Sequence, residues 1–140
     1  MLTSPLIFYA DDDQDDLELF EEAASSLWVK IRLFSEPGEM LEEINKDIAH
    51  PAIIFVDLNM PMISGYDVIR ILRTNNITTP IVVLSTSAAH KNIEDAYDVG
   101  ANYYITKLTS ISKLKSAIEY TLGINWETFK PSLKEFTHLR

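Results

Sequence analysis

The chain has 140 residues, no cysteine and a formal net charge of −9, a length that fits one domain and a composition that excludes disulfides and thiolate metal sites. No apolar run approaches the ~20 residues that span a bilayer, and the first residues lack the basic segment of a cleaved signal peptide, so we expect a cytoplasmic protein without a membrane anchor. Eight acidic residues crowd the twelve positions from Asp11 to Glu22, a charge density that repels nucleic acid, so nucleic-acid binding is not expected.

The first half of the chain alternates short apolar runs with amphipathic segments. Residues 6–10 form an apolar run that predicts a buried strand, and residues 30–33 alternate charged with apolar side chains, as an edge strand does. Between these two strands, an amphipathic helix is predicted, because apolar residues recur at helical spacing at Leu17, Phe20, Ala24 and Leu27. Pro37 suits the first turn of a second helix. The inward face of that helix is expected to carry Met40, Leu41, Ile44 and Ile48.

The second half repeats this alternation. Residues 53–56 and 81–84 are unbroken apolar runs, which are typical of strands covered on both sides, and residues 103–106 predict a fifth strand. A helix is predicted after each of these strands. The signals for the three helices are the capping-box pair Ser64 and Asp67, the stop at Gly100, and the apolar positions Ile111, Leu114, Ile118 and Leu122. This strict alternation predicts an α/β fold with a parallel, doubly wound sheet.

Most of the predicted strands run directly into a polar residue. Asp11 and Asp12 come after the first strand, Asp57 after the third, Ser85 after the fourth and Lys107 after the fifth. In an open α/β sheet these carboxyl ends line the edge where ligands bind. Carboxylates without cysteine or histidine favour Mg²⁺, and a cation, a hydroxyl and an ammonium around one carboxylate suit phosphoryl transfer to Asp57. Taken alone, each residue also fits a helix start, a turn or a surface charge.

These motifs together resemble the receiver domain of bacterial two-component response regulators. They are, in chain order, Asp11-Asp12-Asp13, the segment 57–61 with Gly65, Ser85-Thr86-Ser87, and the segment 100–107. The resemblance covers residues 6–122 and implies a flavodoxin-like, five-stranded parallel sheet with strand order 2-1-3-4-5. It implies a receiver domain over residues 1–123 and a C-terminal extension over 124–140 that is not a separate domain.

The resemblance also implies a role for each site residue. Asp57 would accept a phosphoryl group from a sensor histidine kinase or a histidine phosphotransfer protein. The Mg²⁺ ligands would be Asp12 directly, Asp11 through water, Asp57, and Asn59 through its backbone carbonyl. The phosphate-binding and switch residues would be Ser85, Thr86, Tyr104 and Lys107. One departure from the family is Leu108, because receivers usually carry a cis proline there; a cis bond before leucine costs about 3–4 kcal/mol, so we expect a trans Lys107–Leu108 bond and a rearranged lysine loop.

By the same resemblance, the face formed by the fourth helix, the fifth strand and the fifth helix would contact a downstream protein target or a second copy of the chain. The residues expected on this face are Asn92, Tyr97, Tyr103, Lys113 and Lys115. The extension 124–140 carries three aromatics, Trp126, Phe129 and Phe136, which could pack back on the domain or contact a partner, with a homodimer as one option.

Three other functions stay open. A receiver-like module could act by protein contact without phosphorylation. Asp57-Leu58-Asn59 also resembles the start of haloacid-dehalogenase-like phosphatases, but these enzymes place a second acid where this chain has Asn59. A flavin-binding module would need a Ser/Thr/Gly-rich loop after the first strand, where this chain has Asp11-Asp12-Asp13. We therefore expect a stand-alone signalling switch without enzymatic turnover.

Overall fold

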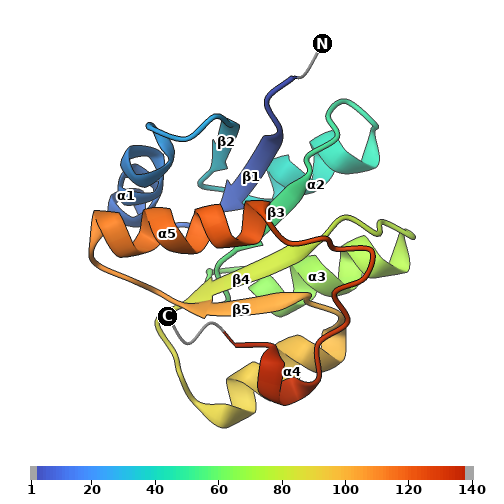
Figure 1. Cartoon of the computed structure of the whole chain (residues 1–140). Coiled ribbons are helices and arrows are strands. Elements are labelled where there is room, and N and C mark those ends of the chain that lie inside the picture. The colour runs from blue at the N-terminus through green and yellow to red at the C-terminus, as the bar shows by residue number, and fades with distance from the viewer. Residues whose placement is uncertain (1–2, 138–140) are drawn as a thin grey trace.

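The computed structural model describes residues 3–137 and contains one five-stranded parallel sheet (Figure 1). The strands are β1 (Leu6–Ala10), β2 (Lys30–Phe34), β3 (Ile53–Val56), β4 (Ile81–Ser85) and β5 (Tyr103–Thr106). Their order across the sheet is β2-β1-β3-β4-β5, and every neighbouring pair is parallel. The predicted doubly wound, flavodoxin-like sheet is therefore confirmed.

Helices cover both faces of the sheet (Figure 1). They are α1 (Gln14–Ala24), α2 (Pro37–Asn45), α3 (Gly65–Thr74), α4 (His90–Val99) and α5 (Ile111–Leu122). Because side chains alternate along a strand, Phe8 packs in the cluster under α2, α3 and α4, whereas Tyr9 packs in the cluster under α1 and α5. Among residues 3–137, none of the helices combines the length and apolarity that a membrane-spanning segment requires.

Local sequence signals explain where these helices begin and end. Ser64 and Asp67 form the predicted reciprocal capping box at the start of α3, and Gly100 ends α4 with a φ of 110° that favours glycine. The prediction that Ile48 faces inward on the second helix is wrong. The helix ends at Asn45, Asp47 takes a left-handed φ of 61°, and Ile48 is 64% exposed.

The described part of the extension, residues 124–137, packs back on the domain at the free edge of β5. Trp126 and Phe129 pack with the cluster under α1 and α5, whereas Phe136 is fully buried in the cluster on the opposite face. The Tyr104 amide donates a hydrogen bond to the Phe136 carbonyl at 2.9 Å, and Tyr104 forms a parallel bridge with Thr137. The extension therefore wraps around the edge strand and covers backbone groups that would otherwise lack a partner.

Candidate functional site

The acidic cluster forms because two neighbouring strands end side by side. Asp11 follows β1 and Asp57 follows β3, and the Asp57 amide donates a hydrogen bond to the Ala10 carbonyl at 3.0 Å. Carboxylate oxygens of Asp11, Asp12 and Asp57 lie within 4.8 Å of one another. Asp11 is fully buried and Asp57 is 4% exposed, whereas Asp12 is exposed. The structure thus brings the three predicted carboxylates together in a site that opens at Asp12.

Burial and crowding change the protonation of this cluster. Burial, together with the charge of Asp11, raises the pKa of Asp57 to about 6, although Lys107 acts in the opposite direction. The Tyr9 hydroxyl and the Asp13 amide both donate hydrogen bonds to the Asp11 carboxylate. Burial raises the pKa of Tyr9, and its bond to Asp11 adds to this shift, so Tyr9 acts as a neutral donor to Asp11.

The donor set fits a hard divalent cation. Three carboxylates from two loops offer one oxygen each, and Mg²⁺ is bound in proteins through one or two carboxylates together with water molecules. A cation at this point would neutralise negative charge that burial otherwise makes costly. The side chain of Asn59 is exposed, and its predicted role involves only its backbone carbonyl. The backbone amide of Asn59 also lowers the pKa of Asp57 through a hydrogen bond, against the larger effect of burial.

Lys107 follows β5 and reaches across the cluster. Its ammonium nitrogen lies 2.8 Å from Asp11 Oδ2, 2.7 Å from Asp16 Oδ2 and 3.4 Å from Asp57 Oδ1. Burial disfavours its charge, but hydrogen bonds to Asp11 and Asp16 outweigh this effect and raise the pKa of Lys107. The peptide bond to Leu108 is trans, as predicted.

The predicted switch residues lie at the ends of β4 and β5. Ser85 is fully buried, and its hydroxyl accepts a hydrogen bond from the Ser87 amide at 3.2 Å, while Thr86 is exposed. The Tyr104 ring is fully buried, and its hydroxyl donates to the Ser87 carbonyl at 2.7 Å. Burial raises the pKa of Tyr104, although hydrogen bonds with Ser85 and Ser87 partly offset this.

A glycine allows the loop that carries Asp57 to lie against α3. A Cβ added to Gly65 would lie 2.2 Å from the Asp57 carbonyl oxygen and 2.8 Å from the Leu58 Cα, both backbone atoms. The Gly65 amide also donates a hydrogen bond to the Leu58 carbonyl at 3.0 Å. Only the absence of a side chain permits this close approach, so Gly65 fixes the position of Asp57.

The residues expected on the contact face differ from one another in exposure and in their hydrogen-bond partners. Asn92 donates to the Ser87 hydroxyl at 2.6 Å, and the Tyr97 hydroxyl donates to the Pro131 carbonyl at 3.1 Å. Lys113 is exposed and Lys115 is partly exposed. Tyr103 differs from the expectation, because its side chain is only 3% exposed.

The extension explains the burial of Tyr103. The ring of Phe129 lies 6.0 Å from the Tyr103 ring in an edge-on arrangement, and the Tyr120 ring lies 5.8 Å away on α5. The extension thus covers part of the surface that the resemblance leaves open for partners.

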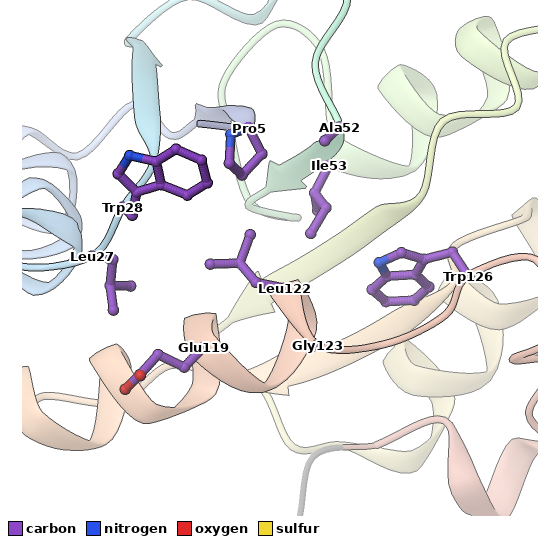
Figure 2. A pocket seen from close by; sticks show the side chains of 9 residues that line it. All are labelled: Pro5, Leu27, Trp28, Ala52, Ile53, Glu119, Leu122, Gly123 and Trp126. Atoms are coloured by element: carbon purple, nitrogen blue, oxygen red, sulfur yellow. The ribbon is translucent and has the colours of Figure 1, made fainter. Parts of the chain in front are cut away.

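Two apolar hollows lie at opposite ends of the sheet. One, of about 510 Å³, opens beside Asp12 and is lined by the loops after β2 and β3, including Pro61 and Met62. The other, of about 490 Å³, lies at the amino end, where Leu122 and Ile53 separate Trp28 from Trp126 (Figure 2). Among residues 3–137, Glu119 is the one charged residue that lines this second hollow.

Several residues of the site were not among those predicted from the sequence. They are Tyr9, Asp16 and Ser87, together with Phe136, which covers Tyr104. Asp16 lies one helical turn before the buried Phe20, so helical periodicity could have placed it near the sheet. No local pattern indicates that Tyr104 contacts Ser87 or Phe136, because these residues lie far from it in the chain.

Comparison with known families gives a match over most of the chain. The model of the family described as "Response regulator receiver domain" matches residues 7–119. Transcriptional regulatory protein PrrA of Mycobacterium tuberculosis is 25% identical over 136 residues, which are 97% of this chain and 58% of PrrA. Cell cycle response regulator CtrA of Brucella ovis is 44% identical over 55 residues, which are 39% of this chain and 24% of CtrA. The chain therefore spans less than two thirds of the length of either relative.

Solved structures show the same fold. Response regulator RPA3017, described in red light signaling of R. palustris, is 28% identical and superposes with a TM-score of 0.76 over 91% of this chain and 99% of its own. The receiver domain of the Francisella response regulator 1452 is 25% identical, with a TM-score of 0.75 over 91% of this chain and 100% of its own.

Proposed function

This chain belongs to the family of response regulator receiver domains of two-component systems, and we propose that it is a switch that accepts a phosphoryl group on Asp57. Receiver domains are signalling switches rather than turnover enzymes, and response regulators act with histidine kinases. In this chain the donor would be a sensor histidine kinase or a histidine phosphotransfer protein. The response would be a protein contact made by the phosphorylated state.

The observation that carries this proposal is the surroundings of Asp57. Its carboxylate is buried beside Asp11 and Asp12, and the Lys107 ammonium lies 3.4 Å from Asp57 Oδ1. A structural aspartate at a loop would not need two further acids and a lysine brought from separate strand ends. Positive charge close to a buried carboxylate instead suits a reaction in which negative charge accumulates there.

The transfer uses the Asp57 carboxylate as the nucleophile. A carboxylate oxygen would attack phosphorus, the bond between phosphorus and the donor's imidazole nitrogen would break, and the nitrogen would keep the electron pair. An acyl phosphate on Asp57 and a histidine on the donor result. The donor's side chain would approach from the side of Asp12, the exposed carboxylate of the cluster. Lys107 would pair with one phosphoryl oxygen, and the Ser85 hydroxyl would donate to another.

We propose Mg²⁺ as the cation of the acidic cluster. Asp11, Asp12 and Asp57 would hold it together with the Asn59 backbone carbonyl, and when bound it neutralises charge on the carboxylates and on the incoming phosphoryl oxygens. Receiver domains bind Mg²⁺ at such an acidic pocket, and the three carboxylates here lie close enough to share one ion.

Ser85 and Tyr104 would transmit the effect of phosphorylation from Asp57 to the surface of the domain. Movement of the Ser85 hydroxyl toward a phosphoryl oxygen changes the contacts of Tyr104, whose hydroxyl bonds with the Ser87 carbonyl and whose ring packs on Phe136. Tyr97 also contacts the Phe136 ring. The face of α4, β5 and α5, with its covering extension, would therefore be the surface that changes for a protein target or a second copy of the chain.

Intact-mass measurement after incubation with acetyl phosphate tests this function. The unmodified protein should gain one phosphoryl group when Mg²⁺ is present, and gain far less when the metal is chelated. The Asp57→Asn variant should gain none under either condition. A gain that is equal in the variant, or that is independent of Mg²⁺, would overturn the proposal.

A further inference from the structure

We propose that Asp16 is a positioning residue that competes with the phosphoryl group on Asp57 for the Lys107 ammonium. This inference rests on the proposed function, because it concerns the charge that Asp57 acquires on phosphorylation. It adds a residue of α1 to the set that controls the site. In this arrangement the strength of phosphoryl binding is set partly by how firmly Asp16 holds the lysine.

The distances show that Lys107 is held by carboxylates other than that of Asp57. Its nitrogen lies 2.7 Å from Asp16 Oδ2 and 2.8 Å from Asp11 Oδ2, which are short charge-assisted hydrogen bonds. The separation from Asp57 Oδ1 is 3.4 Å, which is long for a hydrogen bond between an ammonium and a carboxylate. The ammonium therefore lies toward α1 rather than against the proposed acceptor.

Burial strengthens the attraction between Lys107 and Asp16, and with it the competition for the ammonium. The side chain of Lys107 is 14% exposed and that of Asp16 is 32% exposed, so water screens their attraction less than it would at an open surface. A phosphoryl group on Asp57 carries roughly two negative charges in place of the single charge of the carboxylate, and an ammonium has only three protons to donate. Lys107 already donates two of these protons, to Asp11 and Asp16, so a phosphoryl oxygen would share the ammonium with both carboxylates.

Asp16 is the contact that remains in competition once the cluster holds a cation. A cation between Asp11, Asp12 and Asp57 draws on the charge of Asp11, whereas Asp16 lies outside that group of ligands. Its position is fixed by the helix itself, since the Asp13 side chain caps α1 by accepting a hydrogen bond from the Asp16 amide at 3.1 Å. The backbone of Asp16 is therefore held at the start of α1, in a position from which its carboxylate reaches Lys107.

The same helical turn offers a matched control. Asp15 is exposed, and within residues 3–137 its side chain takes part in no hydrogen bond or ion pair. Asp15→Asn and Asp16→Asn remove the same charge from adjacent positions of α1. A difference between these two variants therefore isolates the contact with Lys107 from the general effect of net charge.

The experiment measures the affinity of the full chain for beryllofluoride, a phosphoryl mimic, at saturating Mg²⁺. Asp16→Asn should bind beryllofluoride about five- to tenfold more tightly than Asp15→Asn, as expected for loss of one charge-assisted hydrogen bond that competes with binding. Asp16→Ala should show the same gain, which provides a second variant if one of them folds poorly. Urea unfolding of each variant checks that the fold is kept.

A double-mutant cycle supplies a readout that a merely structural role would not change. In a Lys107→Met background, which binds beryllofluoride more weakly in itself, Asp16→Asn should have no effect beyond that of Asp15→Asn. Persistence of the gain in that background, or equal affinities of the Asp15 and Asp16 variants, overturns the inference while leaving the proposed function intact. Failure of the unmodified protein to bind beryllofluoride with Mg²⁺ would instead count against the proposed function.

Discussion

Phe136 of the C-terminal extension lies directly against Tyr104 of β5. The Phe136 carbonyl accepts the Tyr104 amide hydrogen bond at 2.9 Å, and the two ring centroids are 6.2 Å apart. Both side chains are fully buried. The extension is therefore part of the same core as the residue that we propose to transmit the phosphorylation signal.

Truncation of Phe136 should destabilise the whole domain. Phe136→Ala removes a buried aromatic from the cluster on the α4 face and should lower the free energy of unfolding by about 3–5 kcal/mol. Lys134→Ala, at an exposed position of the same segment, should change it by less than about 0.5 kcal/mol. Urea unfolding measures both. A cost below about 1 kcal/mol for Phe136→Ala would show that the extension is not docked in solution.

The close approach of α3 to the Asp57 loop makes a prediction about two glycines. Gly65→Ala places a Cβ 2.2 Å from the Asp57 carbonyl oxygen, so the loop must shift, at a cost of about 1–3 kcal/mol in unfolding free energy. Gly38→Ala is the control, because its Cβ would meet nothing within 4 Å. Since Gly38 lies in α2, alanine there should be neutral or stabilise by up to about 1 kcal/mol. Equal effects of the two substitutions in thermal unfolding would contradict this account.

The raised pKa of Asp57 predicts how stability depends on pH in the metal-free protein. The pKa rises from 3.8 to about 6 on folding, so the folded state binds this proton more tightly than the unfolded state. Above pH 6 the buried, charged carboxylate of Asp57 therefore lowers the free energy of unfolding. Asp57→Asn should therefore raise the free energy of unfolding of the metal-free protein near pH 7 by up to about 3 kcal/mol. Loss of the attraction between Lys107 and the Asp57 carboxylate reduces this gain.

The dependence of this stabilisation on pH tests whether burial of the Asp57 charge causes it. The stabilisation should shrink as the pH falls through about 6 and disappear below about 4, where Asp57 is protonated in both states. Urea unfolding in chelator at pH 7.5, 5.5 and 4 follows it, with Asp15→Asn as the charge-matched control. A gain of constant size at every pH would show that burial of the Asp57 charge is not its cause.

Because Asp12 is exposed, a substitution there should change the affinity for Mg²⁺ without changing the stability of the fold. Asp12→Asn should weaken Mg²⁺ binding by roughly tenfold or more, with little change in the unfolding free energy without metal. Asp13→Asn is the control, because asparagine caps a helix about as well as aspartate does and Asp13 caps α1. Calorimetric titration with Mg²⁺ gives both affinities. If the two variants bind Mg²⁺ equally well, the assignment of Asp12 as a ligand fails.

The fold could be predicted from the sequence because its signals are local and repeat. Five predicted strands, each followed by amphipathic spacing, specify a parallel sheet with helical crossovers, and the polar residues after four of these strands then indicate one shared edge. Asp11, Asp57 and Lys107 meet at that edge because of topology alone. Knowledge of the strand ends was therefore enough to predict that these three residues would come together.

The rest depends on contacts that no local pattern records. Helical periodicity can place Asp16 on the side of α1 that carries Phe20, but no local pattern shows that Lys107, 91 positions away, donates a hydrogen bond to it. The family resemblance places Tyr103 on an exposed contact face, but Phe129 of the extension covers it. In both cases the deciding partner lies more than 20 positions away in the chain.

The most direct test of the central claim locates the phosphoryl group. The protein is incubated with acetyl phosphate and Mg²⁺, the acyl phosphate is reduced with borohydride, and the modified residue is identified by peptide sequencing in the mass spectrometer. Our account predicts one reduced residue, Asp57, with Asp11 and Asp12 unmodified. Reduction at another carboxylate, or a phosphoryl group that borohydride does not remove, would contradict the assignment of Asp57 as the acceptor.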